Sequence, residues 1–182
     1  MNLKSKRLLQ RVRVPLGFLF GIIFLYFANP EPIALTVGGI IALGGLLIRA
    51  WASGHIRKNA QLAVSGPYAF TRNPLYLGSF FLGLGFAIAS GVWWIGIGFA
   101  ILYLGIYFPV MRVESEDLTR LFGEEYKNYA EKVPLFFPLP TSYKASGEKF
   151  DLALYLRYRE YRAALGLLFA WSVLLVKAIF LR

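Results

Sequence analysis

The stretch LYLGSFFLGLGFAIASGVWWIGIGFAILYLGIYFPVM, from Leu75 to Met111, contains no charged residue. A single helix over it would be about 55 Å long at 1.5 Å per residue, against a hydrocarbon core of about 30 Å. The chain must therefore fold back, and Ser90–Gly91 is the obvious turn because both residue types favour turns. The stretch predicts two membrane helices, over Leu75–Ala89 and Val92–Val110.

Three further apolar runs flank this hairpin, at Val14–Ala28, Ile33–Trp51 and Ala163–Leu181. Each approaches the length needed to cross a membrane, with basic residues such as Arg49 snorkelling from its ends. The first run follows a basic segment, as in a secretory signal, but Asn29–Pro32 is not a small-residue cleavage site. We therefore expect an all-α bundle of about five membrane helices.

The composition agrees with one membrane domain. The 182 residues are 57% hydrophobic and 16% charged, which is too apolar for a soluble fold of this size. Cysteine is absent and histidine occurs once, so the sequence excludes disulfides, a thiol nucleophile and multi-histidine metal sites. The net charge of +10 comes from basic residues beside apolar runs, which favours contact with membrane lipids over nucleic acid.

The distribution of basic residues predicts the orientation. Segments 1–13, 53–73 and 112–162 hold nearly all of them, whereas the turns at 29–32 and 90–91 hold none. By the positive-inside rule, the N-terminus and the polar segments are expected on the cytoplasmic side.

Small residues predict how the membrane helices pack, because they let two backbones approach closely. They recur on one face of the second helix and on one face of the third: Gly38, Ala42 and Gly45, then Ser79, Gly83 and Ala87.

The polar segment 112–162 is expected to start as a helix on the membrane surface. Pro134, Pro138 and Pro140 then break it. Asp151–Arg162 mixes Leu, Tyr and Arg in the manner of an interfacial helix.

The connector before the third membrane helix, Arg57–Gly78, looks too specific for a plain loop. Gly66–Pro67 forms a turn, and Arg72–Pro74 places proline at a helix start, where it is tolerated. Polar groups would thus be held at the mouth of the bundle. The alternative is an ordinary connector with interfacial Tyr68 and Tyr76, and both interpretations stay open on the residue types alone.

The second distinctive segment is Arg112–Tyr126. At helical spacing Glu114 falls on the apolar stripe above Leu118. A carboxylate there needs a cationic partner or a ligand. A structural ion pair with Arg72 or Arg112 and a ligand-binding role are both open.

Both segments contain short motifs in a fixed order. They are Gly66-Pro67-Tyr68, Arg72-Asn73-Pro74-Leu75-Tyr76-Leu77-Gly78, Glu114, Phe122-Gly123-Glu124-Glu125-Tyr126, Tyr129 and Val133-Pro134. This series resembles the isoprenylcysteine carboxyl methyltransferases and their phospholipid methyltransferase relatives. Their pattern is a Gly-x-Tyr turn, an Arg-His-Pro-x-Tyr-x-Gly helix start, a paired-Glu helix, Phe-Gly-x-Glu-Tyr and a terminating Val-Pro. The resemblance covers about Trp51–Pro138.

The resemblance implies an integral membrane methyltransferase that uses S-adenosylmethionine on a lipid-like or prenylated acceptor at the cytoplasmic leaflet. By position it implies cofactor contacts at Lys58, Gln61, Leu62, Ala63, Tyr68, Asn73, Pro74, Leu75, Tyr76 and Glu114, with Glu114 receiving the ammonium group. It implies catalytic roles for Arg72, Asn73 and Arg112, the last near the place of a substrate-contacting arginine.

Two positions depart from the family pattern. Asn73 replaces the motif histidine, and Ser115 replaces the second glutamate of the pair. Asparagine can donate and accept hydrogen bonds, but it cannot act as a base. We therefore expect an acceptor that needs little base assistance.

Two other functions remain as alternatives. Membrane sterol reductases have a similar Arg-His-Pro-x-Tyr helix start but use NADPH. A non-catalytic lipid-binding protein could retain the fold after losing the histidine and one glutamate. The acceptor itself stays open among isoprenylated cysteine, phosphatidylethanolamine and another amphiphile.

Overall fold

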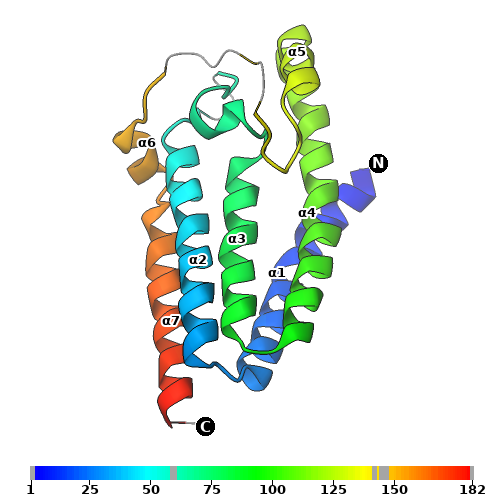
Figure 1. Ribbon diagram of the computed structural model, residues 1–182. Coiled ribbons are helices and arrows are strands. Elements are labelled where there is room, and N and C mark those ends of the chain that lie inside the picture. The colour runs from blue at the N-terminus through cyan, green and yellow to red at the C-terminus, as the bar shows by residue number, and fades with distance from the viewer. Residues whose placement is uncertain (1–2, 58–60, 141–142, 144–147, 181–182) are drawn as a thin grey trace.

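A computed structural model describes residues 3–57, 61–140, 143 and 148–180, with side chains from Pro15 onward. The regular structure in the described part is entirely helical, which confirms the predicted all-α class. Figure 1 shows the arrangement. The elements are α1 (Leu3–Phe27), α2 (Pro32–Ser53), the 3₁₀ helix η1 (Gly66–Ala69), α3 (Pro74–Ala89), α4 (Trp93–Phe122), α5 (Glu124–Lys132), α6 (Leu152–Arg157) and α7 (Tyr161–Phe180).

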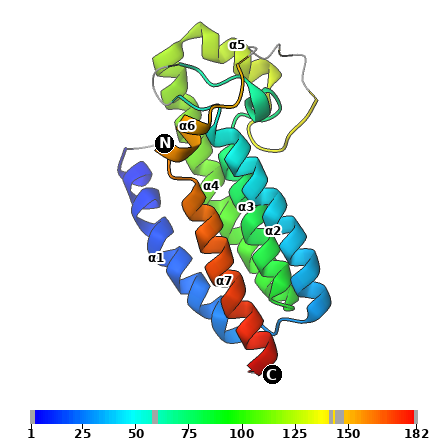
Figure 2. The same cartoon turned by 90° about the vertical axis from the view of Figure 1, so that its left-hand side faces the viewer.

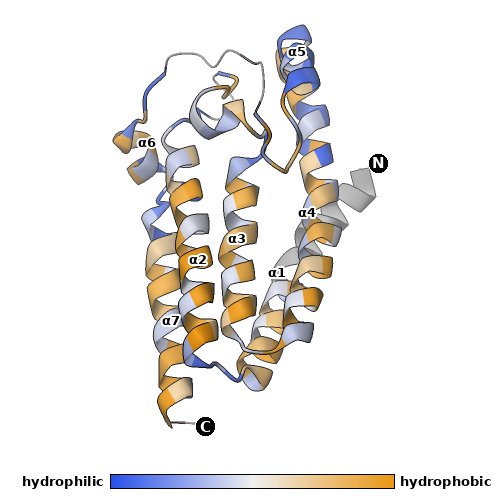
Figure 3. Cartoon of the chain, viewed as in Figure 1, coloured by the Kyte–Doolittle hydropathy of each residue, from blue (hydrophilic) through white to orange (hydrophobic). Residues whose placement is uncertain are grey.

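Three helices of the described chain, α2, α4 and α7, are long and apolar enough to cross a membrane. Residues 15–27 of α1 and the whole of α3 are shorter apolar helices alongside them. Figure 3 shows apolar residues along these helices and polar ones gathered at the end of the bundle that carries α5. The predicted number of about five spans stays a prediction for the two shorter helices.

At their facing glycines, helices α2 and α3 approach so closely that no Cβ fits. A Cβ placed on Gly45 would lie 2.5 Å from the carbonyl oxygen of Gly78, and one on Gly78 would lie 2.6 Å from that of Gly45. Two turns away, a Cβ on Gly85 would lie 2.5 Å from the carbonyl oxygen of Gly38. The small-residue face predicted on the second helix, including Ala42, is thus confirmed as a packing face.

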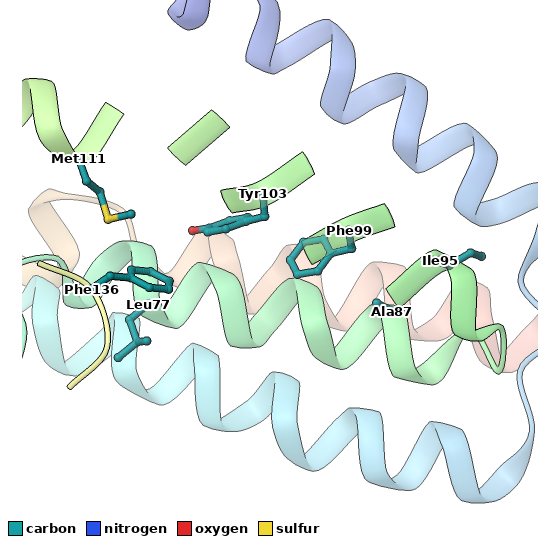
Figure 4. Close-up of a cluster of buried hydrophobic side chains, with 7 residues drawn as sticks. All are labelled: Leu77, Ala87, Ile95, Phe99, Tyr103, Met111 and Phe136. Carbon is teal, nitrogen blue, oxygen red and sulfur yellow. The ribbon is translucent and has the colours of Figure 1, made fainter. Parts of the chain in front are cut away.

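The face predicted on α3 divides between two neighbours. A Cβ on Gly83 would overlap the ring of Phe99 in α4, and Ala87 is buried against α4 as well. Ser79 instead meets Arg49 of α2. Figure 4 shows the resulting core between α3, α4 and the segment after α5. Its buried members are Leu77, Ala87, Ile95, Phe99, Tyr103, Met111 and Phe136.

The tight turns are placed as the sequence predicts. Gly91 between α3 and α4 has a φ of +70°, a conformation that glycine adopts without strain, and a Cβ there would meet the Asn29 carbonyl oxygen. Ser90 ends α3 and accepts a backbone hydrogen bond from Asn29, 2.7 Å long. The two turns at this end of the bundle therefore pack against each other.

Helix α4 corrects one expectation. A separate helix on the membrane surface was expected from Arg112, but α4 runs unbroken for 30 residues, about 45 Å, to Phe122. The polar residues after Met111 include two arginines and two glutamates, which are good helix formers, so the membrane helix continues through them. Pro109 is accommodated inside the helix, and Gly123 with a φ of +57° ends it.

The segment before α7 is also less regular than expected. The predicted interfacial helix over Asp151–Arg162 is not continuous: it consists of α6 and the first two residues of α7, and Arg159 with a φ of +56° lies between them. The Asp151 side chain caps α6 by accepting a hydrogen bond of 2.8 Å from the Ala153 backbone. The predicted break at Pro134 is confirmed, because α5 ends at Lys132.

The only histidine, His55, is buried where the connector leaves α2. Its Nδ1 lies 2.9 Å from the Ser65 hydroxyl, and its ring fills the space beside Gly66, whose φ is +56°. Burial lowers the pKa of His55 below its ordinary value of 6.5, and the Glu148 carboxylate opposes this in part.

The lowered pKa of His55 predicts a stability that depends on pH. The native state holds the ring neutral, so the unfolded state takes up a proton first as the pH falls. The contribution of the neutral His55 ring to the free energy of unfolding should be fully present above pH 6.5. It should decrease as the pH falls from 6.5 toward the lower native pKa. His55→Gln, which can keep the bond to Ser65, should flatten this dependence in thermal unfolding at pH 7.5 and 5.5. An equal change in unfolding temperature between the two pH values for the wild-type protein and His55→Gln would contradict this prediction.

Candidate functional site

A cavity of about 1110 Å³ lies at the polar end of the bundle, where both distinctive sequence segments meet. The connector and the start of α3 line one side, and the last turns of α4 together with α5 line another. From this polar part the cavity continues along the apolar helix α1. It thus has a polar region and an apolar region.

The predicted cofactor residues that the structure describes all lie in the wall of this cavity. They are Gln61, Leu62, Ala63, Tyr68, Asn73, Pro74, Leu75, Tyr76 and Glu114. Arg72 lines it too, whereas Lys58 lies outside the described residues. Arg112 does not line the cavity; its guanidinium is exposed and lies over the Phe108 ring, 4.9 Å from the centroid.

Glu114 and Tyr76 join the two segments directly. The Tyr76 hydroxyl donates a hydrogen bond of 2.8 Å to Glu114 Oε1. Glu114 is exposed toward the cavity, and among the described residues it forms no ion pair with Arg72 or Arg112. The structural ion pair considered for Glu114 is therefore not formed, and its charge remains available to a ligand.

Arg72 has neutral partners. Its Nη1 donates to the Ser115 hydroxyl at 3.3 Å and to the Tyr126 hydroxyl at 3.4 Å, and Tyr126 in turn donates to Ser115 at 2.8 Å. Its buried Nε has no hydrogen-bond partner in the described structure. The family pattern has a glutamate at the position of Ser115. In this chain Arg72 therefore contacts a hydroxyl at that position and not a carboxylate.

Asn73 is fixed by the chain that returns after α5. Its side-chain amide donates to the Leu135 carbonyl at 2.9 Å, and the neighbouring Arg72 backbone donates to the Pro134 carbonyl at 2.9 Å. The Thr71 hydroxyl donates to the Phe136 carbonyl at 2.7 Å. These bonds hold the start of α3 rigidly against residues 134–139, and no local pattern in the sequence indicates them.

Tyr68 is held from α5 and offers a free hydroxyl. The Tyr129 hydroxyl donates a hydrogen bond of 2.6 Å to the Tyr68 carbonyl. The Tyr68 hydroxyl is buried and has no partner among the described residues. Burial, and the Tyr129 phenol beside it, raise the pKa of Tyr68, so it stays a protonated donor.

Removing the Tyr129 hydroxyl should loosen this wall. Tyr129→Phe leaves the Tyr68 carbonyl without a donor, which should lower the free energy of unfolding by about 1–3 kcal/mol. Thermal unfolding in maltoside micelles measures this. Tyr26→Phe, whose side chain is exposed on α1, serves as control and should change little. Equal effects of the two substitutions would argue against the role of this bond.

Arg49 corrects a second expectation, because it does not snorkel. Its Nη2 lies 2.7 Å from Glu160 Oε2. Its Nη1 bonds to the Ser79 hydroxyl and, at 3.4 Å, to the Leu75 carbonyl. The carboxylate of Glu160, which lies just before α7, keeps the Arg49 guanidinium inside the bundle. The two residues are 111 positions apart, so local sequence patterns did not indicate the pair.

The part of the cavity wall on α1 was also not predicted. It comprises Gly17, Phe18, Gly21, Ile22 and Leu25.

Comparison with known proteins shows the family of the chain. A sequence profile described as phospholipid methyltransferase matches residues 36–125, about half of the chain. The match contains the connector, the hairpin α3–α4 and the helical segment that carries Glu114. The chain belongs to this family of membrane methyltransferases.

The relatives of this chain include metal-resistance proteins and an isoprenylcysteine methyltransferase. The nickel-cobalt-cadmium resistance protein NccN of Alcaligenes xylosoxydans xylosoxydans is 35% identical over 57% of this chain and 49% of the relative. The cobalt-zinc-cadmium resistance protein CzcN of Cupriavidus metallidurans is 31% identical over 63% and 53%. The protein-S-isoprenylcysteine O-methyltransferase of Schizosaccharomyces pombe is 25% identical over 73% and 58%.

The chain spans about half the length of these curated relatives. No solved structure gives a significant match. Together with its apolar helices, the family membership identifies the chain as an integral membrane protein.

Proposed function

We propose that this phospholipid methyltransferase family member uses S-adenosylmethionine to methylate an amphiphilic acceptor at the cytoplasmic leaflet. The observation that carries the proposal is the cavity itself. It gathers every described residue to which the family pattern assigns a cofactor contact, and it extends from there along an apolar helix. Basic residues at its polar end favour the cytoplasmic side.

The residues present fit S-adenosylmethionine, which would supply an electrophilic methyl group on a sulfonium. Glu114 offers a carboxylate for the ammonium group of the methionine moiety, and the Tyr76 hydroxyl orients that carboxylate. The unpartnered Tyr68 hydroxyl and Arg72 Nε are buried donors in the same wall. Buried donors without partners are costly, so a ligand that accepts from them gains affinity.

The protein contributes alignment and exclusion of water rather than acid–base chemistry. The bonds of residues 71–73 to the returning chain make the start of α3 rigid, as a fixed attack geometry requires. The Asn73 amide is already bound to the Leu135 carbonyl and cannot take up a proton. We therefore expect the acceptor to arrive as a competent nucleophile.

The shape of the cavity supports a second ligand. At about 1110 Å³ it lies at the upper limit for ligand pockets, about 300–1,000 Å³, and it continues along α1 beyond the residues assigned to the cofactor. Its further wall on α1, with Phe18 and Ile22, suits an alkyl or prenyl chain. An amphiphile with its reactive end toward Tyr76 would fill both regions.

Titration calorimetry of the purified protein in maltoside micelles tests the proposal. S-adenosylmethionine should bind, and labelled cofactor with extracted lipids should yield a species heavier by one methyl group in mass spectrometry. No binding to the wild-type protein would refute the proposal. Binding of NADPH in its place would favour a reductase, and binding of neither would favour a non-catalytic lipid-binding protein.

A further inference from the structure

Helix α6 lies at the boundary between the apolar and the polar part of the molecule. The backbone of Asp151, just before α6, donates a hydrogen bond of 2.9 Å to the carbonyl of Gly54, just after α2. Both α2 and α7 are long and apolar enough to cross a membrane. Figure 2 shows α6 at the level where α7 begins, with α5 further out. Helix α6 is therefore placed where hydrocarbon meets headgroups.

The side chains of α6 suit this depth. Leu152 and Leu156 lie one turn apart on the same face, and both are exposed. Tyr155 and Tyr158 are half-buried beside them, and tyrosine is typical of membrane interfaces. Because the two leucines are exposed, the acyl chains of surrounding lipid can cover them.

Three arginines follow within six residues of one another. They are Arg157 at the end of α6, Arg159 in the turn and Arg162 in the first turn of α7. All three side chains are exposed, and none forms an ion pair or a side-chain hydrogen bond with another described residue. The neighbouring carboxylate of Glu160 is turned into the bundle by its ion pair with Arg49. The three positive charges therefore have no counter-charge in the described part of the chain.

Arg159 occupies a backbone position that favours another residue type. Its φ is +56°, and it is the only residue other than glycine with a positive φ in the described chain. Glycine and asparagine adopt this conformation more readily than arginine does. The turn itself needs only backbone groups, since the Arg162 N–H donates to the Arg159 carbonyl at 3.0 Å. The charge of the side chain supplies the reason for an arginine here.

We infer that α6 and the turn to α7 form a surface that binds an anionic phospholipid of the adjacent leaflet. Arg157, Arg159 and Arg162 face its phosphate, to which guanidinium groups donate strong, charge-assisted hydrogen bonds. Leu152 and Leu156 face its acyl chains. None of the three arginines lines the cavity, so this surface is separate from the proposed methyl-transfer site and does not depend on that function.

Native mass spectrometry in maltoside micelles tests the inference with two lipids of the same chains. Dioleoylphosphatidylglycerol is anionic and dioleoylphosphatidylcholine is zwitterionic, and both are supplied in equal amounts. The wild-type protein should retain the anionic lipid about tenfold or more in preference, and added salt should reduce this preference. Equal retention would overturn the inference. Displacement of the anionic lipid by millimolar inorganic phosphate would also overturn it, because the surface would then take a free anion.

Removal of a single arginine charge should weaken the preference. A basic residue near a membrane surface contributes about fivefold in affinity for anionic lipid, so Arg157→Gln and Arg162→Gln should each lower the preference by about three- to fivefold. Lys132→Gln removes the same charge from an exposed side chain at the end of α5 and should leave the preference unchanged. Equal losses in all three variants would reflect net charge alone and would overturn the inference.

Two substitutions of Arg159 separate its charge from its backbone conformation. Arg159→Asn removes the charge and suits the φ of +56°, so it should unfold at the wild-type temperature or above. It should nevertheless lose about threefold in preference for the anionic lipid. Arg159→Lys keeps the charge and should keep most of the preference. An unchanged preference in Arg159→Asn would mean that this arginine serves only the turn, which overturns the inference.

Discussion

Glu114→Gln should lower the affinity for S-adenosylmethionine by about 30-fold or more. The substitution keeps the size of the side chain and an oxygen for the Tyr76 hydroxyl, but it removes the charge that would face the ammonium group. Loss of one partner of a desolvated charge pair costs about 2–5 kcal/mol, and 1.4 kcal/mol is a factor of ten in Kd. Titration calorimetry in maltoside micelles measures the change.

Glu116→Gln is the matched control for Glu114. It alters the net charge equally, two residues further along α4, but Glu116 does not line the cavity. Its affinity should stay within about twofold of the wild-type value, since a charge outside the cavity is screened by solvent. Equal losses for both variants would show that net charge matters and that Glu114 has no special contact. An unchanged Kd in Glu114→Gln would remove it from the cofactor site.

Gly45→Ala should destabilise the whole bundle. The added Cβ would lie 2.5 Å from the Gly78 carbonyl oxygen, and backbone atoms of a packed helix cannot turn aside as a side chain can. Helices α2 and α3 would have to separate. We expect a loss of about 3 kcal/mol, at the upper end for overpacking, or roughly 6–12 °C in the unfolding temperature.

The neighbouring glycine provides the control for this prediction. A Cβ on Gly44 would meet nothing within 4 Å. Gly44→Ala should therefore leave the unfolding temperature unchanged or raise it by about 3 °C, because alanine favours a helix more than glycine does. Thermal unfolding of both variants in the same micelles decides. Similar destabilisation at both positions would mean that helix flexibility, and not close packing, requires these glycines.

Much of the fold could be predicted from sequence because its signals are local. The apolar runs define α2, α3 and α7 to within a few residues, and Ser90–Gly91 indicates the turn between α3 and α4. The spacing of Gly38, Ala42 and Gly45 depends only on helix geometry, so it gave the packing face of α2 correctly. For the site, the family pattern selected residues that the structure places in one cavity wall.

The remaining features depend on partners far away in sequence. Arg49 was expected to snorkel because its neighbours in sequence suggest only a helix end, whereas Glu160 supplies the charge that turns it inward. The hydrogen bond from Asn73 to the Leu135 carbonyl likewise could not be predicted from the neighbouring residues.

The length of α4 was underestimated for a different reason. A change from apolar to polar residues indicates a change of surroundings and not a helix end.

Pro109 within α4 gives the long helix a point of weakness. Proline has no N–H group, so the carbonyl of Gly105, four residues earlier, lacks its helical hydrogen bond. This interruption comes little more than one turn before Glu114, between the membrane part of α4 and the part that extends beyond it. The terminal turns can therefore bend as a unit about that point while the membrane part stays fixed. A ligand that draws Glu114 further into the cavity needs to deform only this joint.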